Sequence, residues 1–169
     1  ASGAAMVAQA RDAFGRLDVI VANAAIGQEA SFHNISLAAY REIFEIGFFG
    51  TLHLVHAAWP VLREQRYGRV VLTTSSAGRF GGHGLTAYAA AKGATEMLMR
   101  SLAAEGASRG IKVNAISPYA LSQMTEAHLA PALARRLAPD AVAPMVAWLA
   151  SEACTVSGEV IVAAGGRYR

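Results

Sequence analysis

The chain has 169 residues, of which 54% are hydrophobic and 16% are charged. This length and apolar content are enough for a sizeable core and exclude a disordered chain, so we expect a single domain over residues 1–169. Fifteen basic and twelve acidic residues leave a formal charge of only +3 and are scattered singly, which excludes an extended nucleic-acid-binding surface.

The apolar stretches do not predict a membrane span. The longest, residues 43–62, is interrupted by Glu45, His53 and Pro60, so it is typical of a buried helix. The single Cys154 excludes an internal disulfide and fits a reducing compartment, and we therefore expect a cytoplasmic protein. The five histidines lack metal-ligand spacing, so no metal site is predicted.

Helical and strand patterns alternate along the chain. Helices are predicted over residues 3–14, 37–64, 87–108, around 125–137 and over 140–151, and strands over 17–22, 69–74, 111–117 and 159–163. Ser36 is placed to cap the long helix, and Pro60 to bend its last turns. The strands are hydrophobic without alternation, which indicates an α/β fold with a parallel, doubly wound sheet flanked by helices.

A candidate proton-transfer site follows the strand 69–74. Tyr88 and Lys92 are four residues apart, so a helix places the phenol and the ammonium on one face, a turn apart. A nearby cation favours the phenolate and lowers the tyrosine pKa. Alone, such a pair is more often a packed tyrosine beside a solvated lysine. Here a buried strand ends at Ser75, where ligands of open α/β sheets bind, and a glycine-rich segment follows.

This arrangement resembles the short-chain dehydrogenase/reductase family, whose Ser-Tyr-Lys motif matches Ser75, Tyr88 and Lys92. Ser75 is preferred to Ser76 because the family's serine usually lies thirteen positions before the tyrosine. Three further segments are similar to family motifs: the strand ending in Asn23-Ala24-Ala25, the strand leading to Pro118, and the last strand before Gly165-Gly166. The resemblance covers essentially the whole chain and implies the C-terminal portion of a Rossmann-type sheet.

Residues 118–125 and 137–149 look like one branch of the family, the 3-hydroxyacyl-CoA dehydrogenase domain of peroxisomal multifunctional enzyme type 2 and its bacterial relatives. The resemblance implies an oxidoreductase that uses NAD or NADP to interconvert a secondary alcohol and a ketone, with a 3-hydroxyacyl-CoA-like molecule as the candidate substrate. Tyr88 would exchange the hydroxyl proton, Lys92 would lower the tyrosine pKa and hold the nicotinamide ribose, and Ser75 would hydrogen-bond the carbonyl oxygen.

The resemblance also implies the residues that contact each ligand. The cofactor contacts are Asn23, Ala24, Ala25, Tyr88, Lys92, Pro118, Ser122 and Thr125. The substrate contacts are Ser75 and Tyr88, together with His83 from the loop between them.

Some positions depart from the family pattern. Ala25 stands where the family has Gly, which adds a methyl group near the adenosine. Gly47 stands where most members have an Asn that holds a relay water, so the relay behind the lysine must use water or another residue, or be weak. Gln123 replaces an expected Thr; Ser122 or Thr125 is then the candidate partner of the nicotinamide carboxamide, although Thr125 suits a helix N-cap equally well.

The family's glycine-rich turn and the residue that selects NAD or NADP have no match in the chain. The family's fourth strand corresponds to residues 17–22 and lies beside the first, so we expect an apolar, unpaired edge there. We expect a part of a longer enzyme, truncated or with its N-terminal region unresolved. The alternatives are a short protein that uses a partner chain, and a non-catalytic dehydrogenase-like subunit that acts through oligomer packing.

The two longest predicted helices carry more apolar residues than one buried face needs: Phe44, Phe48, Phe49, Leu52, Val55, Trp59, Met97, Leu98 and Leu102. A helix that is hydrophobic on more than one side is usually buried on more than one side. In the resembling family such helices pair with those of a second subunit, so a homodimer or homotetramer is expected. The alternative is that all these side chains belong to the core of one chain.

Overall fold

The computed structural model describes residues 2–122, 125–126, 130–134 and 136–169. Over these residues the chain forms a five-stranded sheet in the order β1-β2-β3-β4-β5. Its strands are β1 (Val19–Ala22), β2 (Gly68–Thr73), β3 (Ile111–Tyr119), β4 (Val160–Ala164) and β5 (Arg167–Tyr168). The first four run parallel, and only β5 is antiparallel to its neighbour. The predicted α/β class with a parallel sheet is confirmed.

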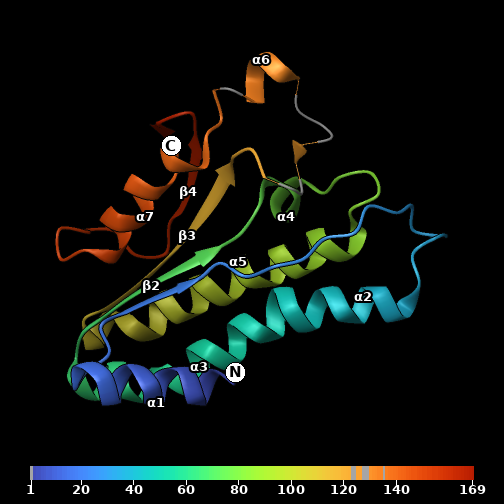
Figure 1. Ribbon diagram of the computed structural model, residues 1–169. Coiled ribbons are helices and arrows are strands. Elements are labelled where there is room, and N and C mark those ends of the chain that lie inside the picture. Colours follow the sequence, from blue (N-terminus) through green and yellow to red (C-terminus); the bar gives the residue numbers. More distant parts are fainter. Residues whose placement is uncertain (1, 123–124, 127–129, 135) are drawn as a thin grey trace.

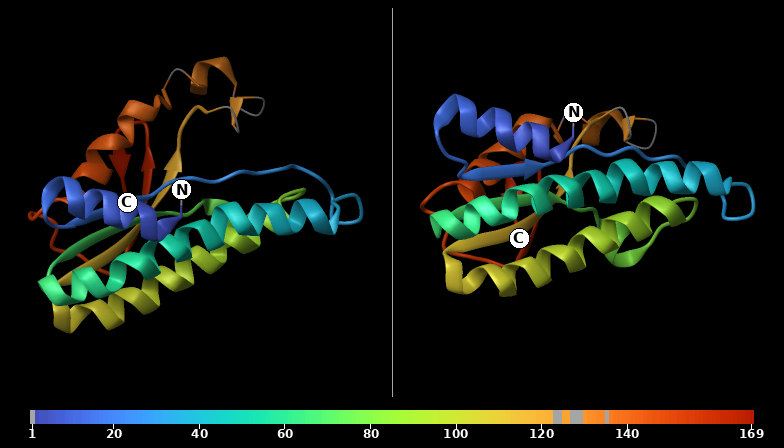
Figure 2. Two further views of the ribbon diagram at one scale, coloured as in Figure 1. Left: turned by 60° about the horizontal axis from the view of Figure 1, so that its bottom comes forward. Right: turned by 90° about the horizontal axis from the view of Figure 1, so that it is seen from below.

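Helices cover both faces of this sheet (Figure 1). One face carries α1 (Gly3–Phe14), α3 (Gly50–Gln65) and α5 (Thr86–Gly106), and the other carries α7 (Ala143–Ala150). The helix α2 (Leu37–Phe44) extends beyond the sheet and runs beside α5, as the two views in Figure 2 show. None of the helices in the described residues has the length and apolar character needed to cross a membrane.

The core has a separate cluster on each face of the sheet. Toward the three-helix face, Val70, Leu72 and Val113 pack with Leu62 and Met99. Toward α7, a second cluster is built from Val71, Ile116, Val142, Leu149, Cys154 and Ala163. Successive strand residues therefore enter opposite clusters, and both must be apolar. This explains why the strand sequences are hydrophobic without alternation.

The helix predicted over residues 37–64 is interrupted in the structure. It begins as expected, with the Ser36 hydroxyl accepting a hydrogen bond from the Ala39 amide at 3.1 Å. At Glu45–Phe49 the backbone forms one π-helical turn before α3 continues. Gly47 lies buried in this turn, and the nearest atom that a Cβ built there would meet, among the described residues outside its own helical backbone, is the Ala91 Cβ at 3.9 Å.

The segment after β2 was predicted to be a glycine-rich loop and instead contains a short helix, α4 (Ser76–Phe80). Ser75 is its N-cap and accepts a hydrogen bond from the Ala77 amide at 3.2 Å. The helix ends at Gly81, whose φ of 72° favours glycine. A serine N-cap and a glycine at the C-terminus are sufficient to delimit one helical turn. The Ser75 side chain is therefore fixed by its hydrogen bond to the backbone of α4.

Differences elsewhere are smaller. The helix predicted around residues 125–137 falls partly outside the described residues, and the described part includes the short helix α6 (Pro131–Ala134). Short 3₁₀ turns occupy Ala107–Arg109 (η2) and Pro139–Ala141 (η4). The antiparallel β5 was not predicted.

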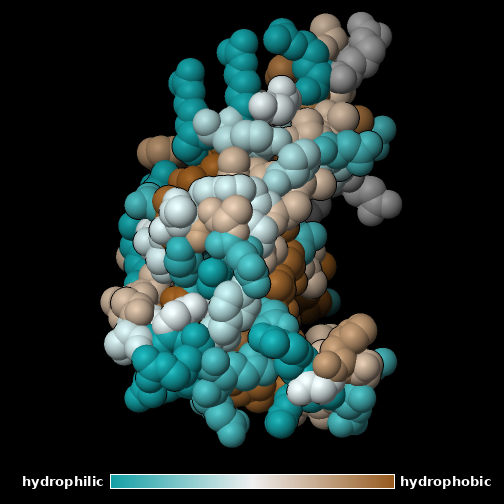
Figure 3. Space-filling view, turned by 90° about the vertical axis from the view of Figure 1, so that its left-hand side faces the viewer, coloured by the Kyte–Doolittle hydropathy of each residue, from teal (hydrophilic) through white to brown (hydrophobic). Residues whose placement is uncertain are grey.

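The strand β1 forms one edge of the sheet, as expected, although it is only four residues long. Two of its side chains, Val19 and Val21, are 39% and 45% exposed. Figure 3 views the molecule from the left-hand side of Figure 1. In this space-filling view, hydrophobic side chains gather in a hollow at the right-hand edge. An apolar edge of this kind is a surface on which another polypeptide can pair.

Candidate active site

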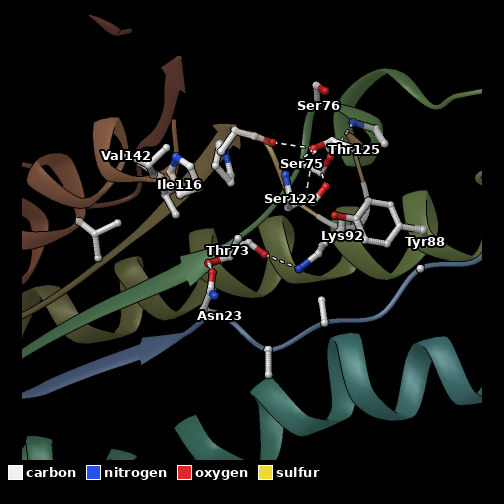
Figure 4. A pocket seen from close by; sticks show the side chains of 18 of the residues that line it. Asn23, Thr73, Ser75, Ser76, Tyr88, Lys92, Ile116, Ser122, Thr125 and Val142 are labelled. Carbon is white, nitrogen blue, oxygen red and sulfur yellow. Dashed lines mark hydrogen bonds between the residues drawn. The ribbon is translucent and has the colours of Figure 1, made fainter. Parts of the chain in front are cut away.

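The carboxyl ends of β1, β2 and β3 open into one large cavity, of about 1220 Å³ (Figure 4). Its polar lining includes Asn23, Thr73, Ser75, Ser76, Tyr88, Lys92, Ser122 and Thr125. Its apolar lining includes Val21, Ala24, Ala25, Ile116, Pro118, Pro139, Val142, Ala143, Val146, Ala147 and Ala150. The cavity therefore brings together every predicted cofactor contact, and the serine, tyrosine and lysine of the predicted catalytic set.

Lys92 is buried on α5, with 2% of its surface exposed. Its ammonium donates a hydrogen bond of 2.7 Å to the carbonyl oxygen of Thr73, at the end of β2. Burial lowers the pKa of Lys92 from 10.5 to about 8, because the charged form loses its hydration. A lysine with this pKa is a mixture of charged and neutral forms at mildly alkaline pH.

Tyr88 lies one turn before Lys92 on α5, with the lysine nitrogen 5.8 Å from the centre of its ring. Burial raises the pKa of Tyr88, and the hydrogen bond with the Ser75 side chain lowers it by a smaller amount. The expectation that Lys92 lowers this pKa is therefore wrong for the structure as it stands. The lysine nitrogen is directed at Thr73, so the stabilising contact of the phenolate comes from Ser75.

Thr73 joins the lysine to the first strand. Its side-chain hydroxyl donates to the Asn23 side-chain oxygen at 2.9 Å, and its carbonyl accepts from Lys92. These contacts, drawn as dashed lines in Figure 4, connect the carboxyl ends of β1 and β2 to α5. Sequence reasoning did not include Thr73. Its position as the last residue of β2, two before Ser75, is the signal that could have identified it.

Ser122 and Thr125 form a small hydrogen-bonded turn beyond β3. The Thr125 hydroxyl donates to the Ala120 carbonyl at 2.7 Å and accepts from the Ser122 amide at 2.9 Å. The two hydroxyl oxygens are 3.2 Å apart. Thr125 therefore holds the turn, and the Ser122 hydroxyl is the one with more freedom to bond a ligand. Gln123 lies outside the described residues.

Two other predicted features differ in their placement. His83 is exposed in the loop after α4 and is not among the described residues that line the cavity, so its substrate contact stays a prediction. The α7 side of the cavity was not anticipated. Its signal in the sequence is the apolar run from Val142 to Leu149, but a pattern apolar on all sides does not indicate which side faces a ligand.

Comparison with known proteins identifies the family. A family model described as Enoyl-(Acyl carrier protein) reductase matches residues 1–167. A short-chain type dehydrogenase/reductase of Mycobacterium tuberculosis is 41% identical over 164 residues, covering 97% of this chain and 57% of the relative. An acetoacetyl-CoA reductase of Shinella zoogloeoides is 33% identical over 174 residues, covering 96% of this chain and 72% of the relative. The chain belongs to the short-chain dehydrogenase/reductase family.

The solved structures give the same result for the fold. Full-length peroxisomal multifunctional enzyme type 2 of Drosophila melanogaster superimposes with a TM-score of 0.80 and 31% identity, over 88% of this chain and 27% of that chain. The family and the likeness to this enzyme, both predicted from the motifs, are confirmed. The chain spans 57% of the mycobacterial relative and 27% of the Drosophila chain, so it matches only a part of each.

Proposed function

We propose that this chain supplies the catalytic residues of an NAD- or NADP-dependent oxidoreductase that interconverts a secondary alcohol and a ketone. The observation that carries the proposal is the shared cavity, in which a buried lysine and a half-buried tyrosine from α5 meet a serine from the end of β2. The alternative of a non-catalytic subunit is not favoured, because the family relatives carry dehydrogenase and reductase names.

Each of the three residues has a role that follows from its contacts. The Ser75 side chain and the Tyr88 phenol both line the cavity and interact with each other, so a substrate oxygen placed against both hydroxyls would receive two hydrogen bonds. The phenol would deliver its proton to that oxygen during ketone reduction and take it back during alcohol oxidation. The proton would be replaced through Lys92, whose pKa of about 8 suits exchange near neutral pH.

The residues present fit a nicotinamide cofactor. The Lys92 ammonium and the Ser122 hydroxyl are donors in the lining of the cavity, and Ala24, Ala25 and Ile116 are part of its apolar lining. When bound, this group supplies or accepts the hydride that a secondary alcohol exchanges. Lys92 and Asn23 would hold its ribose side, and Ser122 its carboxamide.

The substrate would be a 3-hydroxyacyl-CoA-like molecule. The name acetoacetyl-CoA reductase of one relative, and the likeness to peroxisomal multifunctional enzyme type 2, support this class. In this cavity the residues from α7 and η4 are apolar, which suits an acyl chain better than a charged substrate.

The decisive experiment is Tyr88→Phe in the full-length enzyme, assayed with acetoacetyl-CoA and either reduced nicotinamide cofactor. Loss of the proton donor should lower kcat by about a thousandfold and leave cofactor affinity nearly unchanged. Tyr40→Phe is the matched control, because the Tyr40 hydroxyl donates to the Thr86 carbonyl at the start of α5 and does not line the cavity. Turnover of Tyr88→Phe close to that of the control would exclude Tyr88 as the proton donor.

The assembly we propose is a homodimer or homotetramer formed through α2, α3 and α5. Most of the apolar side chains on these helices belong to the core of the chain, but Phe49 and Met97 are 36% and 55% exposed. Phe80 at the end of α4 is 83% exposed. Light scattering of the full-length protein should show an oligomer that Met97→Asp dissociates, and a monomer at micromolar concentration would contradict this assembly. The cytoplasmic location also stays a prediction.

A further inference from the structure

A buried carboxylate lies one helical turn beyond the proposed catalytic lysine. Glu96 follows Lys92 by four residues on α5, so Tyr88, Lys92 and Glu96 form one stripe along the helix. Only 5% of the Glu96 surface is exposed. A carboxylate at this burial is costly unless it is paired, so its partners indicate what it does.

Two arginines pair with Glu96, and they come from different elements. The Arg79 Nε on α4 lies 3.1 Å from each carboxylate oxygen. The Arg100 guanidinium lies 3.2 Å from Oε1 and belongs to α5 itself, one turn further on. Of these two ion pairs, the one with Arg79 joins α4 to α5, and the one with Arg100 lies within α5.

The α4 segment lies against α5 without side chains between the two backbones. A Cβ on Gly78 would come within 2.8 Å of the Gly93 nitrogen, and one on Gly93 within 3.1 Å of the Gly78 oxygen. The Thr74 hydroxyl adds a hydrogen bond of 3.0 Å to the Lys92 carbonyl. The contact between the two elements is therefore close, and Figure 1 shows α4 lying over α5.

We infer that Glu96 and Arg79 are positioning residues that clamp α4 to α5 and thereby hold the Ser75 hydroxyl against the Tyr88 phenol. Ser75 caps the start of α4, and Arg79 lies one turn along the same helix. Release of the Arg79 end would let the whole turn lift, and Ser75 would move with it. This inference rests on the proposed function for its effect on catalysis.

The chain contains its own matched control. Arg79→Ala and Arg100→Ala each remove one guanidinium from the same carboxylate, but only the first breaks the link between helices. In the full-length enzyme Arg79→Ala should lower kcat by about ten- to a hundredfold with KM little changed, because misplacement of a catalytic group has effects of this size. Arg100→Ala should stay within about twofold of wild type, because the Arg79–Glu96 contact between the helices stays in place and the Arg100 side chain is 45% exposed. Arg79→Lys keeps a cation in reach of Glu96 and should restore most of the rate.

A second readout does not need turnover. The Gly78 and Gly81 amides donate to the Ser75 and Ala77 carbonyls at 2.9 and 2.8 Å, so they exchange with solvent only when α4 opens. Hydrogen exchange at these amides should be faster in Arg79→Ala and unchanged in Arg100→Ala. Glu96→Gln, which keeps the side-chain shape, serves the same purpose if Arg79→Ala fails to fold.

The outcomes separate the two proposals. A full-length enzyme without alcohol or ketone turnover would contradict the proposed function, while the exchange rates would still decide whether Arg79 holds α4. Equal effects of Arg79→Ala and Arg100→Ala on kcat and on exchange would overturn the clamp. Slower turnover with unchanged exchange would also overturn it.

Discussion

Two buried cations lie at opposite edges of the sheet, and their surroundings differ. Arg69, at the amino end of β2, is 6% exposed and donates to the carbonyls of Gly68, Gly110 and Ser151. Its guanidinium also lies 4.5 Å from the centre of the Tyr67 ring. Lys92, at the carboxyl edge, has three protons to donate and, among the described residues, one hydrogen bond, to Thr73.

The difference in hydrogen bonding indicates a structural role for Arg69 and leaves Lys92 available for a ligand or a proton. Arg69 links the start of β3 and the end of α7 to β2. Its hydrogen bonds to backbone carbonyls compensate the burial of its charge and stabilise the fold. The buried charge of Lys92 is poorly compensated, because the ammonium makes one hydrogen bond among the described residues. Burial therefore lowers its pKa to about 8. A group left in this state can still bind a ligand or release a proton, which a fully bonded group cannot do.

The largest effect should come from Arg69→Met. The change leaves three backbone carbonyls without their donor, and we expect a loss of about 3 kcal/mol of unfolding free energy in the full-length protein. Urea denaturation measures it. Arg63→Met, on the exposed side of α3, is the control and should change stability by less than about 0.5 kcal/mol. A result for Arg69→Met equal to the control would remove the structural role.

Lys92→Met should increase the free energy of unfolding, whereas Arg69→Met should decrease it. It removes a poorly solvated charge and one hydrogen bond, so we expect a gain of about 1 to 2 kcal/mol near pH 7 together with loss of turnover. The same urea experiment checks the stability, and the acetoacetyl-CoA assay checks the activity. A loss as large as that of Arg69→Met would show that both cations are structural and would end the comparison.

The pH dependence sharpens the same contrast. Folded Lys92 releases its proton near pH 8, whereas in the unfolded chain it does so near 10.5, so between these values the unfolded state binds more protons. The stability of the wild type should therefore rise with pH relative to Lys92→Met. The advantage of the variant should be complete below about pH 8 and gone above about pH 10.5. Paired urea curves at the two pH values test this, and a constant gap would contradict it.

The smallest effect concerns Gly47, in the π-helical turn beside α5. Gly47→Ala places a methyl group in ordinary contact with Ala91, so the gain in helix propensity should stabilise the protein by about 0.5 to 1 kcal/mol. Gly78→Ala is the control with the opposite sign, because its Cβ would meet the Lys92 and Gly93 backbone at 2.8 Å. Thermal denaturation of the two variants should show shifts in opposite directions, and a shared direction would be inconsistent with this packing.

Much of the fold could be predicted because it depends on local patterns. The helix over residues 3–14 and the cap at Ser36 follow from side-chain periodicity and one hydroxyl. The π-helical turn at Glu45–Phe49 could not be predicted, since it inserts no break in the apolar pattern. The helix α4 was concealed by Gly78 and by the glycines that follow it. The strand β5 pairs with the adjacent β4 across the turn at Gly165 and Gly166, but its two residues are too few to form a recognisable strand pattern.

The site could be predicted in composition but not in energetics. A spacing of four was enough to bring Tyr88 and Lys92 into one cavity. The direction of the tyrosine pKa depends on burial and on where the lysine nitrogen points, and neither can be obtained from spacing. The Arg79–Glu96 pair likewise joins residues that no single motif contains.

In the part of the chain that the structure describes, β1 is an edge strand of the sheet, and this has a kinetic consequence. Two such edges that meet can pair their free backbone groups, with Val19 and Val21 already exposed beside them. An encounter of this kind is second order, so its rate rises with the square of the protein concentration, whereas folding of the chain is first order and does not change. Dilution therefore favours the folded chain over pairing between edges, and concentrating the sample reverses that preference.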